Sequence, residues 1–458
     1  RTLDQILTKK DYSRKTPASL FYKDSPLWQR LLTIGCVVFL SGAGLGEWKV
    51  LNGMLGGLPK AITLGVIGLA MLYTLFYPDE KRLRELWKPT LLYMSLMVAL
   101  FFWSMVIWIK SFATVSSMIR SCSKLVFQSI AILTAVALVY LFREKAIELF
   151  TISICITNGA IMLLCIPEYG VGASIQSLVT CLVTFGDAVG YARQLEIHDL
   201  TFVFGQMILY YAVFAPRTTR QEKRKRWLYL LLCCWFFLVG MKRIAIPAVV
   251  LFILIALLLR KRKVPSWFYP AVGVCYILFF LVFLYCVRYG IISRLLNSVG
   301  VDMMGRDYLW SMANPYYEFS ITYLGHGFEY VDTIIGQWYS AGLINHPYPF
   351  HNDILKVFVE VGFPGFLLWS GIQYVLTPLF WQRYADQETT LLYLSELGYM
   401  TVTYLTDNTA FYFWSTMALR LVTFAYAMER KKPPEPKVWM PDSRQEMRDR
   451  IRILMKEV

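Results

Sequence analysis

Long apolar runs separated by short polar connectors follow one another from residue 31 to residue 428. Many of these runs approach the roughly 20 residues that a helix needs to cross the core of a bilayer. The first run, Leu31–Leu45, has no small-residue cleavage site after it, so we expect it to remain as a membrane span. The pattern predicts an all-α polytopic membrane protein. The clearest runs are Ala61–Tyr77, Leu91–Ile109, Leu125–Phe142, Ile244–Leu259 and Trp267–Val287.

The connectors carry clusters of basic residues, and these clusters predict how the chain threads the membrane. Lys and Arg gather at residues 81–88, 217–226 and 260–263. Short loops rich in Lys and Arg stay on the cytoplasmic side, and this rule gives about twelve transmembrane helices with both termini cytoplasmic. The predicted spans lie near 31–47, 58–77, 90–109, 125–142, 146–166, 199–215, 227–241, 244–259, 266–288, 352–380, 389–406 and 410–428.

The threading divides the chain into five parts. We expect a cytoplasmic N-terminal arm (1–30), a transmembrane helical bundle (31–288), one large extracytoplasmic loop that carries the catalytic residues (289–350), C-terminal transmembrane helices (351–428) and a cytoplasmic tail (429–458). The tail has the composition of a short amphipathic helix. Within the bundle, Ser174–Val189 is apolar enough to lie in the outer membrane interface.

Composition narrows the class of protein. The chain is 57% hydrophobic and only 17% charged, too few charges to cover a soluble protein of 458 residues. The net charge of +15 falls largely in membrane connectors, which favours a role in topology over nucleic-acid binding. The nine cysteines show no metal-ligand spacing, and no P-loop, HExxH or dinucleotide fingerprint occurs in a suitable context. We therefore expect neither a metal nor a cofactor.

The segment Gly305–Gly365 is the long polar and aromatic exception between the apolar runs. It contains three of the four histidines, His326, His346 and His351. Titratable side chains gathered in one irregular external loop predict an enzyme that works at the bilayer surface.

Three cations are predicted to reach the same external face as this loop. Lys242 and Arg243 interrupt two apolar runs at a hairpin tip, and Arg306 opens the GRDYLW segment. Cations at membrane depth usually face a polar cavity, a partner or a ligand, and guanidinium groups suit phosphate. The structural alternatives are head-group contact for Lys242 and Arg243, and a salt bridge from Arg306 to Asp302 or Asp307.

His351 is the candidate general base. It begins an HN-x9-GxxG pattern with Asn352, Gly362 and Gly365, where the loop returns to the membrane. An imidazole accepts a proton near neutral pH, which suits activation of a sugar hydroxyl. A helix cap, or a hydrogen bond to a carbonyl, is the structural alternative. His326, between glycines in GHGF, is a weaker candidate that can serve only to orient a tight turn.

Aromatic side chains are abundant in the external loop. Tyr and Trp bind the faces of sugars, and they also populate membrane interfaces, so both explanations stay open. The candidate substrate contacts are Trp310 and Tyr323, together with Lys242, Arg243, Arg306, His326 and Asn352.

In combination, these motifs resemble the superfamily of O-antigen ligases and O-antigen or capsular polysaccharide (Wzy-type) polymerases. The resemblance is most specific across residues 240–366 and extends over most of the chain through the many-span layout. Lys242 departs from the pattern, since a small polar residue is common there. The matching residues are Lys242–Arg243, Gly305–Arg306 with Leu309–Trp310, Gly325–His326–Gly327, and His351–Asn352 with Gly362 and Gly365.

The resemblance implies a GT-C-like fold and an inverting, metal-independent glycosyltransferase with an undecaprenyl-pyrophosphate-linked oligosaccharide as donor. By position, it implies that Arg243 (with Lys242) and Arg306 neutralise the diphosphate and that His351 deprotonates the acceptor hydroxyl. It also implies a site on the outer side of the bacterial cytoplasmic membrane. Which of Lys242 and Arg243 contacts phosphate stays open.

We expect a polysaccharide polymerase that joins lipid-linked repeat units into O-antigen, capsule or exopolysaccharide, with a chain-length regulator as an optional partner. A ligase that moves the glycan to a terminal acceptor would use the same residues. A lipid-linked oligosaccharide flippase is the alternative from another class, because many spans and intramembrane cations also suit a transporter. The large one-sided loop and the absence of an internal repeat in the sequence argue against it.

Overall fold

The computed structural model describes residues 27–111, 114–184, 188–300, 303 and 305–430. Every regular element within these ranges is helical, which confirms the predicted all-α class. Most of the predicted N-terminal arm and the C-terminal tail, with its expected amphipathic helix, lie outside the described residues.

Seven segments in the described ranges are long and apolar enough to cross a membrane. Each of them overlaps one of the predicted spans, so the multi-pass membrane architecture is confirmed. They are α2 (Leu27–Leu45), η1 (Leu58–Thr63) with α4 (Leu64–Phe76), α5 (Glu80–Ser111), α6 (Val115–Phe142), α7 (Lys145–Tyr169), α13 (Phe268–Arg288), and α17 (Asp353–Gly371) with η4 (Ile372–Leu376) and α18 (Thr377–Tyr384).

Five further helical segments occupy the remaining predicted spans, although they are shorter or less apolar. They are α10 (His198–Leu209) with η2 (Tyr210–Phe214), α11 (Arg220–Val239), α12 (Ala245–Arg260), α19 (Gln387–Thr406) and α20 (Phe413–Arg430). Helices α19 and α20 are buried almost throughout. Some of their polar side chains bond within the helix, as Thr401 does to the Leu397 carbonyl at 2.7 Å, and others bond to neighbouring helices, as Tyr399 does to the Phe202 carbonyl at 3.1 Å. A helix enclosed by other helices need not be apolar on every face, which explains the modest hydropathy.

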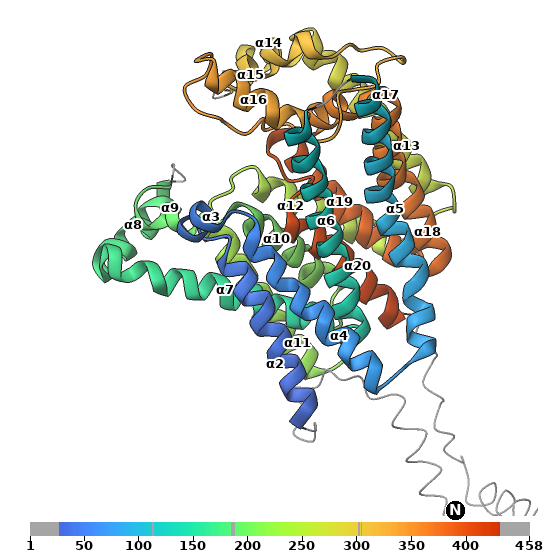
Figure 1. Ribbon diagram of the computed structural model, residues 1–458. Helices are drawn as coiled ribbons and strands as arrows, with labels where there is room; N and C mark the ends of the chain where they lie inside the picture. The colour runs from blue at the N-terminus through green and yellow to red at the C-terminus, as the bar shows by residue number, and fades with distance from the viewer. Residues whose placement is uncertain (1–26, 112–113, 185–187, 301–302, 304, 431–458) are drawn as a thin grey trace, which may run out of the picture.

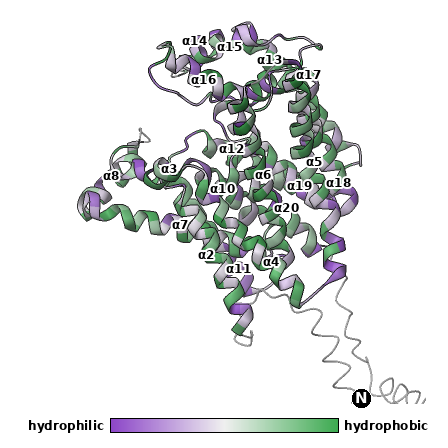
Figure 2. Cartoon of the chain, viewed as in Figure 1, coloured by the Kyte–Doolittle hydropathy of each residue, from purple (hydrophilic) through white to green (hydrophobic). Residues whose placement is uncertain are grey.

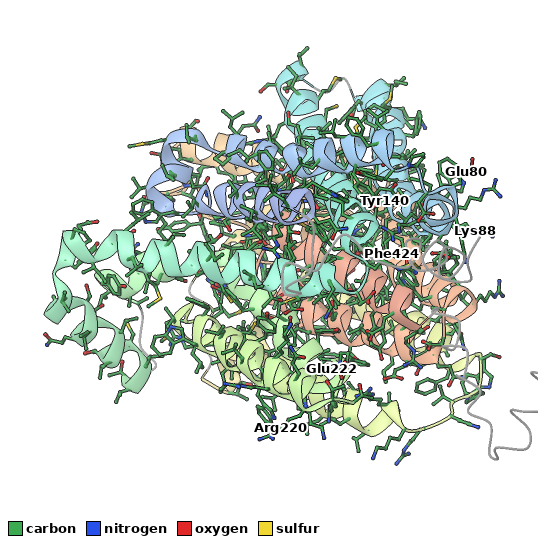
Figure 3. The ribbon with its side chains drawn as sticks, turned by 90° about the horizontal axis from the view of Figure 1, so that it is seen from below. Glu80, Lys88, Tyr140, Arg220, Glu222 and Phe424 are labelled. Atoms are coloured by element: carbon green, nitrogen blue, oxygen red, sulfur yellow. The ribbon has the colours of Figure 1, made fainter. Side chains whose placement is uncertain are left out.

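The bundle has two chemically different ends. We call the end that carries residues 289–350 the outer end and the end that carries the connectors at 81–88 and 217–226 the inner end (Figure 1). Hydrophobic residues predominate along the helices between the ends, and hydrophilic residues gather toward the ends (Figure 2). Figure 3 looks at the inner end, where Lys88 and Arg220 point away from the bundle while Phe424 lies within it.

Short helices build the outer end. The predicted external loop folds as α14 (Ile291–Ser298), α15 (Arg306–Ala313), η3 (Asn314–Tyr316) and α16 (Tyr330–Ser340), which lie above the bundle in Figure 1. Three other short helices, α3 (Lys49–Leu55), α8 (Val171–Thr184) and α9 (Tyr191–Leu195), lie at the side of the bundle, below α14–α16 in Figure 1. The apolar segment predicted for the membrane interface begins in α8.

Candidate active site

A cavity of about 450 Å³ lies at the outer end, and its wall joins segments that are far apart in the sequence. Helices α3 and α6, the 3-10 helix η1 and the start of α10 contribute to the wall. The remaining part comes from residues beside α3 and before α10, from two residues of the segment that carries the predicted base, and from the connection that leads from α19 into α20. These residues are Glu47, Gly57, Glu196, Ile197, Pro349, His351, Asp407, Phe411, Tyr412 and Phe413. The predicted base therefore lines a cavity whose wall comes mostly from residues outside the sequence motifs.

His351 is held against an acidic partner. Its ring nitrogen Nδ1 lies 3.4 Å from Oδ1 of Asp407. The backbone N–H of His351 donates to Oδ1 of Asn408 at 2.9 Å. The φ angle of His351 is +53°, a left-handed conformation that is uncommon for a residue other than glycine. The contacts to residues 407–408 hold this strained residue in place, and such strain recurs at functional sites.

Asp407 is charged throughout the working range of pH. Burial alone would raise its pKa, but the contact with His351 and the positive charge of Lys242 outweigh burial and hold the pKa at about 2. A carboxylate beside Nδ1 favours the tautomer with its proton on Nδ1. Nε2 is then the nitrogen with a free lone pair, which is the form that a general base requires.

Lys242 belongs to the same charged group. Its Nζ lies 2.9 Å from Oε1 of Glu196 and 3.8 Å from Oδ2 of Asp407, and its side chain is only 13% exposed. Glu196 in turn lies 3.9 Å from both Lys49 and His198. Lys242 therefore turns inward to carboxylates, whereas its neighbour Arg243 is exposed. The inward position places the positive charge of Lys242 beside the carboxylate that contacts His351.

The residues around His351 also fix the start of α17. Asn352 caps this helix, and its Oδ1 accepts a hydrogen bond from the Leu355 N–H at 3.0 Å. Trp310 donates from Nε1 to the Phe350 carbonyl at 3.2 Å. Asn352 and Trp310 are both buried, at 0% and 6% exposure. In this structure the two side chains support the backbone on either side of His351.

A kink in α17 explains the two glycine motifs of the sequence. Pro364 has no N–H, so the carbonyl of Glu360 has no partner inside the helix. The N–H groups of His326 and Gly327 donate to this carbonyl instead, at 2.9 and 2.7 Å. Gly362 adopts a φ of +66° at the kink. The GHGF segment therefore completes the hydrogen bonding of the GFPG segment.

Tyr323 and His326 support the external loop at the same place. The Tyr323 hydroxyl lies 2.6 Å from the Val359 carbonyl. The His326 Nε2 lies 2.7 Å from the Tyr316 carbonyl, and its ring stacks on Tyr330 at 4.2 Å. Burial lowers the pKa of His326, so its ring stays neutral. Among the described residues, neither Tyr323 nor His326 lines the cavity.

The two predicted arginines lie at the outer end but outside the cavity wall of the described residues. Arg243 sits in the turn between α11 and α12. Arg306 is half-buried at the first residue of α15, four residues before Trp310 and thus on the same face of that helix. It makes no ion pair with Asp307, and its other expected partner, Asp302, lies outside the described residues. The assignment of both arginines to a diphosphate stays a prediction.

Sequence reasoning missed Asp407, Asn408 and Glu196. A signal for them existed, because Asp407 and Asn408 fall at the tip between the last two predicted spans, and Glu196 falls in a stretch predicted to lie outside. The same topological rule that selected Lys242 therefore places these residues on its side of the membrane.

Comparison with known families bears on the resemblance seen in the sequence. Residues 228–370 match the family described as O-antigen ligase. The resemblance drawn from the motifs is thus confirmed, and the match indicates a ligase- or polymerase-type glycosyltransferase activity. No curated protein matches the chain. The O-antigen ligase segment contains Lys242 and His351, whereas Asp407, Glu196 and the wall formed by α3, η1 and α6 lie outside it.

Proposed function

We propose that this protein is a polysaccharide polymerase that transfers a growing glycan from an undecaprenyl-pyrophosphate-linked donor to the next lipid-linked repeat unit. The reaction would take place at the outer face of the bacterial cytoplasmic membrane, with both termini in the cytoplasm. The observation that carries the proposal is the contact between His351 and Asp407 at the wall of the outer cavity.

The chemical step needs one base and a stabilised leaving group. A hydroxyl oxygen of the acceptor sugar attacks the anomeric carbon of the donor, and its proton passes to Nε2 of His351. The bond between the anomeric carbon and the phosphate oxygen breaks, and lipid diphosphate leaves with the electron pair. Attack from the face opposite the leaving group inverts the anomeric centre. Asp407 stabilises the protonated ring during this step.

Arg243 and Arg306 are proposed to neutralise the departing diphosphate, because guanidinium groups make charge-assisted bonds to phosphate oxygens. Arg243 follows Lys242 directly, and Arg306 lies one helical turn before the Trp310 that holds Phe350. Both side chains therefore come from elements tied to the surroundings of His351. Fixed cations can supply the leaving-group stabilisation that a metal ion supplies elsewhere.

A ligase is the second candidate, and the description of the matched family favours it. A ligase would use the same base and the same cations but would pass the glycan once to a terminal acceptor, such as a lipid A core. The residues of the proposed chemical step do not differ between the two reactions, so the products must separate them.

Purified protein, mixed with a defined lipid-linked oligosaccharide, gives the deciding test. A ladder of products that differ by one repeat unit supports the polymerase. A single transfer that appears only when a terminal acceptor is added supports the ligase. No transfer, together with movement of lipid-linked units across the bilayer of a proteoliposome, would replace both with the flippase.

A further inference from the structure

Gln128 is a buried polar residue in the wall of the outer cavity that the chemical step does not use. Its side chain is 1% exposed. The amide nitrogen donates to the Phe411 carbonyl at 2.6 Å, which fixes the orientation of the amide. Its oxygen, Oε1, is buried and has no hydrogen-bond partner among the residues that the structure describes. An acceptor left without a partner at a cavity wall is costly unless something else donates to it.

The wall around Gln128 combines amides with aromatic rings. Asn52 on α3 and Phe127 on α6 line the same cavity, as do Phe411 and Tyr412. Amide groups exchange hydrogen bonds with hydroxyl groups, and aromatic faces pack against the C–H faces of sugar rings. These are the two properties that a neutral sugar requires.

The charges at this wall are arranged in a way that favours a neutral ligand. Lys60 lies 3.2 Å from Glu47, and Lys49 lies 3.9 Å from Glu196. Lys124 faces the cavity, but its charge also acts on Glu329 and Asp332. A sugar can bind here without displacing these pairs, whereas a phosphate would have to face several carboxylates.

The aromatic residues of the external loop serve a different purpose. Trp310 donates its indole N–H to the backbone carbonyl just before His351, and Tyr323 donates its hydroxyl to a backbone carbonyl of α17. The rings that face the cavity come instead from α6 and from residues 411–413. The contact between sugar and aromatic ring thus falls on the wall that also carries Gln128.

We propose that the wall formed by Asn52, Phe127, Gln128 and Phe411 is the subsite for a pyranose ring of the acceptor glycan. Gln128 Oε1 accepts a hydrogen bond from a sugar hydroxyl, and the aromatic rings pack against the sugar. The subsite rests on the proposed transferase activity, and all its residues lie outside the matched segment 228–370. The base and both proposed arginines thus lie in the matched segment, whereas the residues proposed to select the acceptor lie in α3, in α6 and between α19 and α20.

Gln128→Leu tests the subsite, with Gln206→Leu as the matched control. Gln206 is also buried, at 0% exposure, its amide donates to the Ser415 carbonyl at 3.4 Å, and its Oε1 likewise has no partner in the described ranges. It does not line the cavity. The two substitutions therefore make the same kind of change, but only one of them removes an acceptor from the cavity wall.

We expect Gln128→Leu to raise the KM for the acceptor glycan about 10-fold, the upper end of the net effect of one lost hydrogen bond. The KM for the donor and kcat should stay within about 2-fold of the wild type, and Gln206→Leu should leave all three unchanged. Equal acceptor KM values for Gln128→Leu, Gln206→Leu and the wild type would overturn the subsite.

Asn52→Ala is the second variant, because Asn52 is exposed and its loss does not threaten folding. We expect it to raise the acceptor KM as well, and an unchanged value would contradict the subsite even if Gln128→Leu fails to fold. Binding of the free acceptor glycan, measured without donor, separates this inference from the proposed function. If the protein binds the glycan in a way that depends on Gln128 but shows no transferase activity, the subsite stands and the polymerase proposal fails.

Discussion

The pockets at the two ends of the bundle differ in how they are built. The inner pocket has a volume of about 530 Å³ and is lined by Tyr384 and by five charged residues from one helix, α5. The outer cavity, at about 450 Å³, is smaller, but its wall comes from at least four helical elements and two loops. At the inner pocket, Arg84 and Glu80 are 84% and 83% exposed. At the outer cavity, Asp407 is 9% exposed and contacts both His351 and Lys242.

The difference shows which property of a charged pocket points to chemistry. The inner charges follow one another along α5, and Arg84 pairs with Glu80 at 3.4 Å one turn away, as on any solvated helix face. The outer charges come from distant segments, and Asp407 and Lys242 among them are largely shielded from water, where charges interact more strongly. Convergence and burial, not the number of charges, therefore mark the outer cavity as the candidate active site.

The strongest test of this comparison removes the base. His351→Ala should lower the rate of glycan transfer by about 1,000-fold, within the range that general base catalysis contributes. His346→Ala is the control, because His346 lies exposed in the same external loop. The measurement is product formation from a defined lipid-linked oligosaccharide. A residual rate within tenfold of the wild type would remove His351 from the chemical step.

The second test changes the partner of the base. Asp407→Asn keeps the shape of the side chain and removes its charge, so the protonated form of His351 is less stable. We expect kcat to fall roughly 100-fold. An unchanged kcat would mean that Asp407 does not act on His351.

The same substitution has an effect on stability whose sign follows from the pKa. The pKa of Asp407 is about 2 in the folded protein, below the value of about 3.9 in an unfolded chain. Its charge therefore stabilises the fold above about pH 4, and this contribution is lost as the pH falls from 4 toward 2. The midpoint of thermal unfolding, measured from pH 4 down to pH 2, should fall more steeply for the wild type than for Asp407→Asn.

The sequence predicts the spans well and the site only in part. Lipid imposes hydropathy on a spanning helix, so α13 at Phe268–Arg288 lies within two residues of its predicted limits of 266–288. His351 and Lys242 were selected from motifs, but their link through Asp407 joins two loops that only the folded bundle brings together. The sequence also predicts that Tyr323 lies in the external loop. It does not show that its hydroxyl faces a carbonyl of α17.

The third test addresses the scaffold of the outer cavity. Gly325 has a φ of +87°, and a Cβ there would lie 2.4 Å from the Glu360 carbonyl oxygen and 2.5 Å from the Gly362 nitrogen. Gly325→Ala should therefore destabilise the protein by about 3 kcal/mol. We expect a clearly lower midpoint of thermal unfolding in detergent. Gly336→Ala, where a Cβ meets no atom within 4 Å, is the control and should not lower the midpoint.

The fourth test asks whether fixed cations suffice for the leaving group. Chelation with EDTA should leave the rate of transfer within about 2-fold, because the proposed step uses guanidinium groups where other transferases use a metal ion. The rate is measured before and after chelation and again with added Mg²⁺ or Mn²⁺. A large loss that either metal restores would contradict the roles given to Arg243 and Arg306.

The smallest effect is expected at the inner pocket. Arg84→Ala removes an exposed cation whose ion pair with Glu80 contributes about 0.3–0.5 kcal/mol, so transfer should stay within about 2-fold of the wild type. The measurement is the same transfer assay. Because Arg84 is exposed, the midpoint of thermal unfolding of the variant should also stay close to that of the wild type. A fall comparable to that of Asp407→Asn would show that a row of exposed charges on a single helix matters as much as a buried group drawn from distant segments. Burial and convergence would then no longer distinguish the two pockets, and the inner end would need a role in substrate handling of its own.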